Sequence, residues 1–96
     1  MKTREDILSV LAREKCSLQR RYPLHRLALF GSYARGEPQP DSDVDLLVEV
    51  DPSIGLRFVT LAEDLEALLG LPVDLVSQGA VRPTQMAVLA PELIDV

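Results

Sequence analysis

Two apolar segments joined by a short polar loop constrain the fold of this chain more than any other feature. Residues 26–30 read RLALF, residues 43–50 read DVDLLVEV, and the twelve residues between them include two Gly and two Pro. The second segment alternates apolar and mostly polar residues, as a strand with one buried face does. The loop has room for one helical turn after Gly31. We therefore expect two strands of one sheet, connected by this loop.

A helix is predicted before these strands, over about residues 3–20. Thr3 and Asp6 have the spacing of a capping box, with Asp in place of the usual Glu, and Pro23 ends the segment. Apolar residues recur near the helical period at Ile7, Leu8, Leu11 and Leu18.

A second helix and a third strand are predicted after them. Asp51-Pro52 marks the helix start, and Gly70 is a suitable residue to follow its last turn. The expected core face consists of Leu56, Val59, Ala62, Leu65 and Leu69. Residues 71–77, LPVDLVS, read as a strand, and residues 84–90 as a short helix before an apolar tail.

This order of elements predicts an α/β (α+β) fold, with helices packed on a small mixed β-sheet of about three strands. A chain of 96 residues is long enough for one core, so residues 1–96 are expected to form a single domain. No apolar run is long enough to span a membrane. The charged N-terminus is unlike a signal peptide and Cys16 has no partner for an internal disulfide, so we expect a cytoplasmic protein in which Cys16 is buried or inert.

The charge is unevenly distributed along the chain. Residues 1–35 carry eight Lys or Arg against three acids, whereas residues 36–96 carry two against twelve. Sequence-independent binding to nucleic acid depends on neutralising many phosphates, so direct nucleic-acid binding is not expected of this acidic chain. The acidic part would suit cations instead.

Asp43 and Asp45 are the first candidates for chemistry. Residues two apart in a strand point the same way, with Cα atoms ~6.6–6.8 Å apart, so these carboxylates project side by side. Their repulsion calls for a positive partner, yet no Lys or Arg occurs between Gly36 and Leu56. Mg²⁺ is a natural counter-charge, and two such ions clamp an in-line phosphoryl displacement. Asp74, inside the third apolar strand, supplies another acid.

These acids have two other possible interpretations. A calcium-binding EF-hand loop starting at Asp41 would need Gly at position 46 and Glu at position 52, where the chain has Leu46 and Pro52. That interpretation fails twice. A purely structural role, in which the acids cap a loop, stays open, although nothing local explains Asp74.

The Gly-Ser pair at residues 31 and 32 lies at the other end of the loop. Gly31 permits a sharp turn and a close approach of the backbone to a ligand. The amides that follow begin a helical turn, where a phosphate is favoured. Ser32 adds a hydroxyl donor and Arg35, one turn on, a cation. The segment matches neither the P-loop nor the GxGxxG pattern. Tyr33 is open to either nucleotide contact or packing, and His25 is expected to be structural.

The segment LFGSYARGEPQPDSDVDLLVEV resembles the GS-x10-DxD signature of the DNA polymerase β-like nucleotidyltransferase superfamily, with no departure from the pattern. The short chain is similar to the minimal nucleotidyltransferases of prokaryotes, and Asp74 matches the third acid of the family. The resemblance covers about residues 24–77 and implies the palm-like nucleotidyltransferase fold.

The resemblance also implies roles for the site residues. Gly31 and Ser32, with Arg35, would bind the phosphates of a nucleoside triphosphate, most simply ATP. Asp43 and Asp45 would hold two Mg²⁺. Asp74 would complete the metal site on the acceptor side or accept the proton of the attacking hydroxyl.

Proteins similar to this one pair with a small helical HEPN-type toxin and act as the antitoxin, some by adenylylating a tyrosine of the toxin. The expected function is therefore Mg-dependent transfer of AMP from ATP to a hydroxyl of such a partner. The alternative is a non-catalytic nucleotide- or metal-binding module that neutralises a partner by contact alone. The partner is expected to dock on the basic first helix or on the apolar residues of the C-terminal tail: Val81, Met86, Val88, Leu89, Leu93, Ile94 and Val96.

Overall fold

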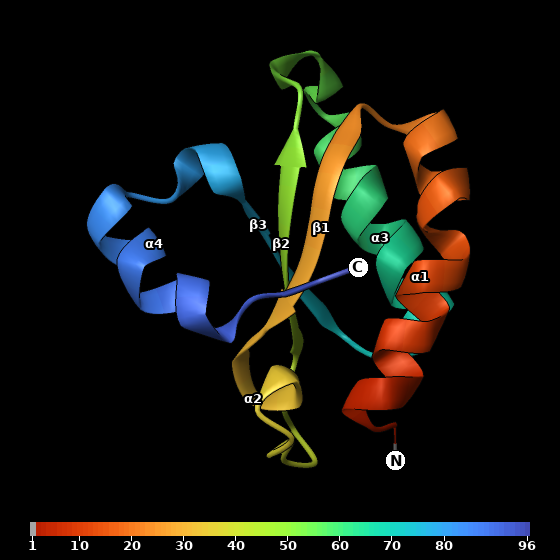
Figure 1. Cartoon of the computed structure of the whole chain (residues 1–96). Helices are drawn as coiled ribbons and strands as arrows, with labels where there is room; N and C mark the ends of the chain where they lie inside the picture. Colours follow the sequence, from red (N-terminus) through yellow and green to blue (C-terminus); the bar gives the residue numbers. More distant parts are fainter. Residues whose placement is uncertain (1) are drawn as a thin grey trace.

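A computed structural model describes residues 2–96 and shows one four-stranded sheet with helices on both of its faces (Figure 1). The long helices α1 (Arg4–Arg21) and α3 (Arg57–Leu69) lie on one side, and the short helix α4 (Pro83–Leu89) stands on the other. Three 3₁₀ turns complete the order: η1 (Pro52–Ile54), η2 (Gln78–Ala80) and η3 (Ala90–Glu92). No described helix has the length and apolar character needed to cross a membrane.

The sheet is mixed and has the order β3-β2-β1-β4. Strands β1 (Leu24–Phe30) and β2 (Val44–Val50) are antiparallel, and β3 (Val73–Ser77) runs parallel to β2. Helix α3 supplies the connection that a parallel pair requires. The predicted fold class is confirmed, but the estimate of about three strands was one too low. Strand β4 (Ile94–Asp95) pairs with the free edge of β1, and its two residues are too few for an alternating pattern to reveal.

The first helix begins as the sequence predicts. The Thr3 hydroxyl accepts a hydrogen bond from the Asp6 amide at 3.2 Å, and the Asp6 carboxylate accepts one from the Thr3 amide at 2.9 Å. This reciprocal pair satisfies two of the amides that a helix N-terminus leaves free. Cys16 was expected to be buried or inert; it is exposed on α1, so the first of these two alternatives was wrong.

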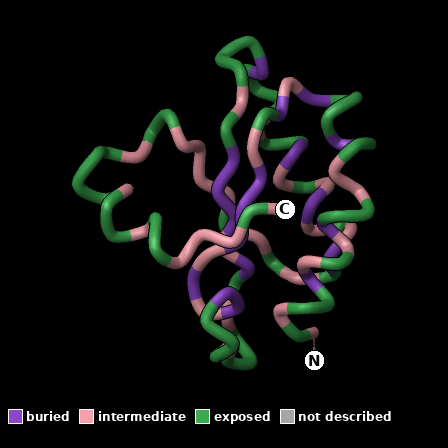
Figure 2. Tube along the Cα trace, in the orientation of Figure 1, coloured by how far each residue is buried: buried purple, intermediate pink, exposed green. Residues whose placement is uncertain are grey.

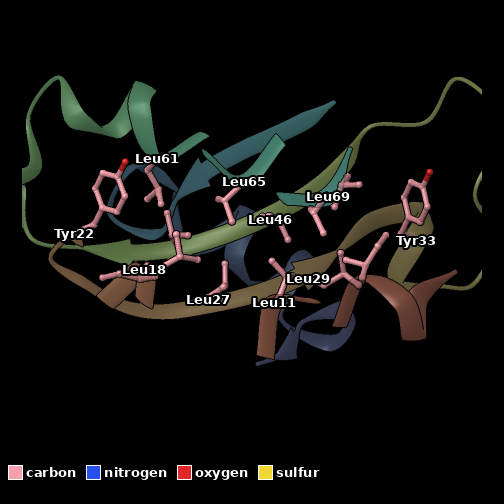
Figure 3. Packing of buried hydrophobic residues seen from close by; sticks show 14 of the residues in the cluster. Leu11, Leu18, Tyr22, Leu27, Leu29, Tyr33, Leu46, Leu61, Leu65 and Leu69 are labelled. Carbon is pink, nitrogen blue, oxygen red and sulfur yellow. The ribbon is translucent and has the colours of Figure 1, made fainter. Parts of the chain in front are cut away.

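The hydrophobic core lies between the sheet and the pair α1 and α3. Figure 3 shows leucines of the two helices meeting those of β1 and β2. Figure 2 shows the same concentration of buried backbone on that side, whereas α4 is exposed or half-buried. The fully buried leucines of this core are Leu11, Leu18, Leu27, Leu29, Leu46, Leu61, Leu65 and Leu69.

Two predictions about α3 were partly wrong. Asp51-Pro52 begins the separate 3₁₀ turn η1, and α3 itself begins only at Arg57, because Gly55 interrupts the helix with a φ of 52°. The predicted core face also differs. Leu65 and Leu69 are fully buried, but Leu56 is 91% and Val59 60% exposed. Because an α-helix has 3.6 residues per turn, residues spaced three apart do not stay on one face. Leu56 and Leu65, nine residues apart, are separated by about two and a half turns and so lie on opposite sides of the helix. The face that packs on the core is instead set by Leu61, Leu65 and Leu69.

This face leads to a stability prediction. Leu65→Ala removes fully buried methyl groups and should lower the free energy of unfolding by about 2–5 kcal/mol. Val59→Ala, on the exposed face of the same helix, should change it by no more than about 0.5 kcal/mol. Urea unfolding followed by circular dichroism measures both values. Equal effects of the two substitutions would contradict the observed helix orientation.

Candidate active site

Three strands bring Phe30, Asp45 and Asp74 into one row across the sheet. Phe30 lies opposite Asp45 in the antiparallel pair, and Asp45 lies opposite Asp74 in the parallel pair. Residues directly opposite in neighbouring strands share a face, and the strands are about 4.8 Å apart. Val44 and Leu46, which flank Asp45 in β2, point into the core. The row therefore lies on the sheet face turned away from α1 and α3. We call it the acid row.

Gly31 lies directly against the acid row. It follows Phe30, opens the four-residue helix α2 (Gly31–Ala34) and has a φ of 79°, a backbone conformation that favours glycine. A β-carbon at Gly31 would lie only 2.0 Å from Oδ2 of Asp45. The Gly-Ser turn and the second acid of the DxD pair, predicted from opposite ends of a loop, are therefore packed together.

Without a counter-ion, the ionised form of the Asp45 carboxyl is electrostatically disfavoured. Burial raises the pKa of Asp45 above its ordinary value, and the negative charges of Asp74 and Asp43 raise it further. Arg35 lowers it. Asp45 therefore interacts with both other predicted acids, which confirms their proximity but not their roles. Asp43 and Asp74 are exposed, Asp45 is half-buried.

Arg35 contacts a residue that the sequence analysis missed. Its guanidinium donates to the carboxylate of Glu92, which belongs to η3 near the C-terminus. Glu92 is also close enough to raise the pKa of Asp45. Because the two residues are 57 positions apart, no local pattern could have revealed this pair. The C-terminal segment thus forms one border of the acid row.

The acids have the right chemistry for a hard divalent cation. Carboxylate oxygens are preferred ligands of Mg²⁺, which completes its coordination with water and phosphate oxygens. Their mutual repulsion at Asp45 is what a cation would relieve. Within residues 2–96, no three His, Cys, Asp or Glu side chains are already gathered closely enough to hold a metal by themselves.

The remaining predicted residues are placed as follows. Ser32 is half-buried in the first turn of α2. Tyr33 is only 3% exposed and belongs to the core cluster, which favours packing over nucleotide contact. The α2 turn is anchored from α1, because the Arg4 guanidinium donates to the Ala34 carbonyl at 3.2 Å. His25 is exposed.

Comparison with known proteins agrees with this geometry. The family model described as the nucleotidyltransferase domain matches residues 12–93, so the class of the protein is that of a nucleotidyltransferase. A solved structure described as a minimal nucleotidyltransferase superimposes with a TM-score of 0.75 at 37% identity, covering 94% of this chain and 95% of that one. The chain belongs to the nucleotidyltransferase family, as one of its minimal members.

Two other similar proteins are informative. The protein adenylyltransferase MntA of Thermococcus cleftensis is 48% identical over 84 residues, which cover 85% of this chain and 84% of that protein. A crystal structure of a toxin-antitoxin with AMP-PNP superimposes with a TM-score of 0.66 at 26% identity, covering 86% of this chain and 69% of that one.

Proposed function

We propose that this protein transfers AMP from ATP to a hydroxyl group of a partner protein, a tyrosine of a helical HEPN-type toxin, and thereby acts as an antitoxin. The observation that carries the proposal is the acid row packed against the Gly31 turn, on a nucleotidyltransferase fold. The names of the relatives support it, since MntA of Thermococcus cleftensis is a protein adenylyltransferase and the AMP-PNP complex is a toxin-antitoxin.

In this proposal the site residues bind the triphosphate, the metal ions and the attacking hydroxyl. The backbone of Gly31 and Ser32, with the Ser32 hydroxyl, binds the triphosphate, and Arg35 adds a positive charge at the end of the same turn. Asp43 and Asp45 hold two Mg²⁺, and Asp74 completes the site on the acceptor side. When bound, the metal ions supply charge neutralisation at the transferred phosphoryl group. Asp74 orients the attacking hydroxyl or takes its proton.

The role of Arg35 gives a prediction on nucleotide affinity. Arg35→Ala should raise the Kd for ATP with Mg²⁺ about tenfold, because a hydrogen bond to a charged group contributes about 1.5–3 kcal/mol and Arg35 is partly solvated. Arg13→Ala, which removes an exposed arginine of α1, is the matched control. Calorimetric titration measures both. An unchanged ATP affinity in Arg35→Ala would show that Arg35 does not bind the triphosphate. The ion pair with Glu92 would then be its only role.

A second prediction concerns the order of binding. ATP should bind weakly without Mg²⁺, because twelve acids after residue 35 disfavour a bare polyanion. Calorimetry with Mg²⁺ should therefore show tight binding that EDTA abolishes. Equal ATP affinity under both conditions would contradict the metal site.

The direct test is transfer itself. The protein is co-expressed with the product of the neighbouring gene, purified by pull-down, and incubated with ATP and Mg²⁺. Intact-mass measurement should show the partner heavier by whole adenylyl groups, and the site of addition should be a tyrosine. A stable complex with no change of mass would favour neutralisation by contact alone, and no complex would remove this partner from the proposal.

A further inference from the structure

An apolar cleft adjoins the acid row and has no role in the function described so far. It has a volume of about 500 Å³, within the range of about 300–1,000 Å³ typical of ligand pockets. Its sheet side consists of Phe30, Asp74 and Val76. Its opposite wall comes from α4 and the segment before it, and consists of Val81, Thr84, Gln85, Val88 and Leu89. We call this the α4 cleft. Figure 1 shows α4 on the side of the sheet away from α1 and α3.

The α4 cleft and the Gly-Ser turn lie on opposite sides of the acid row. Gly31 continues β1 beyond Phe30, in the direction of the start of β2. Val76 lies two residues beyond Asp74 in the other direction, and its neighbours across β2 and β1, Leu47 and Ala28, are apolar. A ligand in the cleft would therefore approach Asp74 from the side away from Gly31.

This placement matters because phosphoryl transfer is an in-line displacement. The attacking oxygen and the leaving oxygen lie on opposite sides of the phosphorus atom. If the pyrophosphate part of ATP is held at the Gly31 turn, the attacking hydroxyl must come from the opposite side, where the α4 cleft opens beside Asp74.

The lining of the cleft indicates the kind of side chain that brings the hydroxyl. Four aliphatic residues and the Phe30 ring make up most of the lining, Thr84 and Gln85 add polar groups on the α4 side, and Asp74 is its one carboxylate. This setting suits a side chain with an apolar body and a polar end. Tyrosine has this character, whereas serine and threonine have too little apolar surface to fill it. The cleft is also accessible to a partner, because β3 is the edge strand of the sheet and Val88 is 71% exposed.

We propose that the α4 cleft is the acceptor subsite and receives the tyrosine side chain of the partner protein, with its phenol oxygen at Asp74. This inference rests on the adenylyl transfer proposed above. In the step, the phenol oxygen forms a bond to the α-phosphorus of ATP, and the bond from that phosphorus to the bridging oxygen of pyrophosphate breaks. The phenol proton passes to the Asp74 carboxylate and then to water, and pyrophosphate leaves with the electron pair of the broken bond.

Binding can be tested without catalysis. In amide NMR spectra of the isotopically labelled protein, N-acetyl-tyrosinamide should shift Val76, Val81 and Val88, while AMP-PNP with Mg²⁺ should shift Gly31 and Ser32. Adenosine alone is the comparison ligand. Shifts of the cleft residues by adenosine but not by N-acetyl-tyrosinamide would assign the cleft to the nucleobase and overturn the proposal. So would N-acetyl-tyrosinamide shifts that are absent, or confined to other surfaces, up to its solubility limit.

A cleft-filling substitution tests the acceptor role in the complex. Val88→Trp fills the cleft from an exposed position of α4, and Val59→Trp places the same side chain on the exposed face of α3. Val88→Trp should raise the KM for the partner at least about tenfold, equal to about 1.4 kcal/mol, with the Kd for ATP unchanged. Val59→Trp should change neither.

The outcomes separate the two proposals. The acceptor subsite would be overturned if Val88→Trp left transfer unchanged, or if it weakened ATP binding instead of raising the KM for the partner. Either result would leave the proposed adenylyl transfer intact. No transfer by the wild-type protein would end the proposed function, and the NMR titration would still decide what occupies the cleft.

Discussion

Asp45→Asn should abolish adenylyl transfer, lowering the rate at least about a thousandfold, while the metal-free protein stays as stable as the wild type or becomes more stable. The loss follows because the substitution removes a proposed metal ligand that supplies several kcal/mol of charge stabilisation, and each 1.4 kcal/mol is a factor of ten. The stability follows from burial and from the charges of Asp74 and Asp43, which disfavour the ionised form of Asp45.

The stability difference between Asp45→Asn and the wild type should depend on pH. The pKa of Asp45 is raised above its ordinary value of 3.8, so the folded wild type loses stability as the pH rises through that raised pKa. The gain in Tm of Asp45→Asn should therefore be present at neutral pH and disappear in acid, where Asp45 is protonated in both the folded and unfolded states. Thermal unfolding with EDTA at several pH values measures it.

Glu49→Gln is the matched control for the transfer measurement. Glu49 is an exposed acid on the same strand and the same face as Asp45, four residues farther along. Its replacement should leave transfer unchanged. Full transfer by Asp45→Asn, or an equal loss in both variants, would contradict the two-metal site.

Gly31→Ala should be the most damaging single-methyl substitution in the site. The new β-carbon would lie 2.0 Å from Oδ2 and 2.9 Å from Cγ of Asp45, in a backbone conformation with a φ of 79°. Either the α2 turn or Asp45 must move, so we expect both lower stability and loss of ATP binding. Chemical unfolding and calorimetric titration measure the two effects.

Gly36 provides a close control. It has a similar φ of 72°, but a β-carbon there would meet no atom within 4 Å. Gly36→Ala therefore incurs only the backbone cost of about 1–2 kcal/mol. Gly31→Ala should be less stable than Gly36→Ala by about 1–3 kcal/mol, the usual cost of overpacking. Adding Asp45→Ala to Gly31→Ala should restore part of that difference. Equal destabilisation by the two glycine variants would show that Asp45 does not press on Gly31.

The local parts of this structure could be predicted from the sequence. The capping box of α1 involves residues three apart, and the alternation in β2 depends on a two-residue period. The positions of α2, β3 and α4 also agree with their predicted segments within two residues. Each of these patterns is set by neighbours along the chain, where residue type and backbone geometry are directly coupled.

The errors arose where distant residues decide the outcome. Strand β4 exists because the edge of β1 is free to pair with it, not because two residues have strand character. The orientation of α3 depends on which leucines reach the sheet, and this left Leu56 and Val59 exposed despite their apolar nature. The pairing of Arg35 with Glu92 likewise requires the C-terminal segment to return to the α2 turn.

The sequence by itself determined the family of the protein and the candidate residues of its site. The Gly-Ser turn and the DxD pair border one loop, so their spacing is a local property. Only the tertiary structure decided how those groups meet. Parallel pairing of β2 with β3 sets Asp74 beside Asp45, and the backbone turn at Gly31 leaves room for the Asp45 carboxylate. Strand register and close packing are long-range properties, since they depend on which residues the whole chain brings opposite one another.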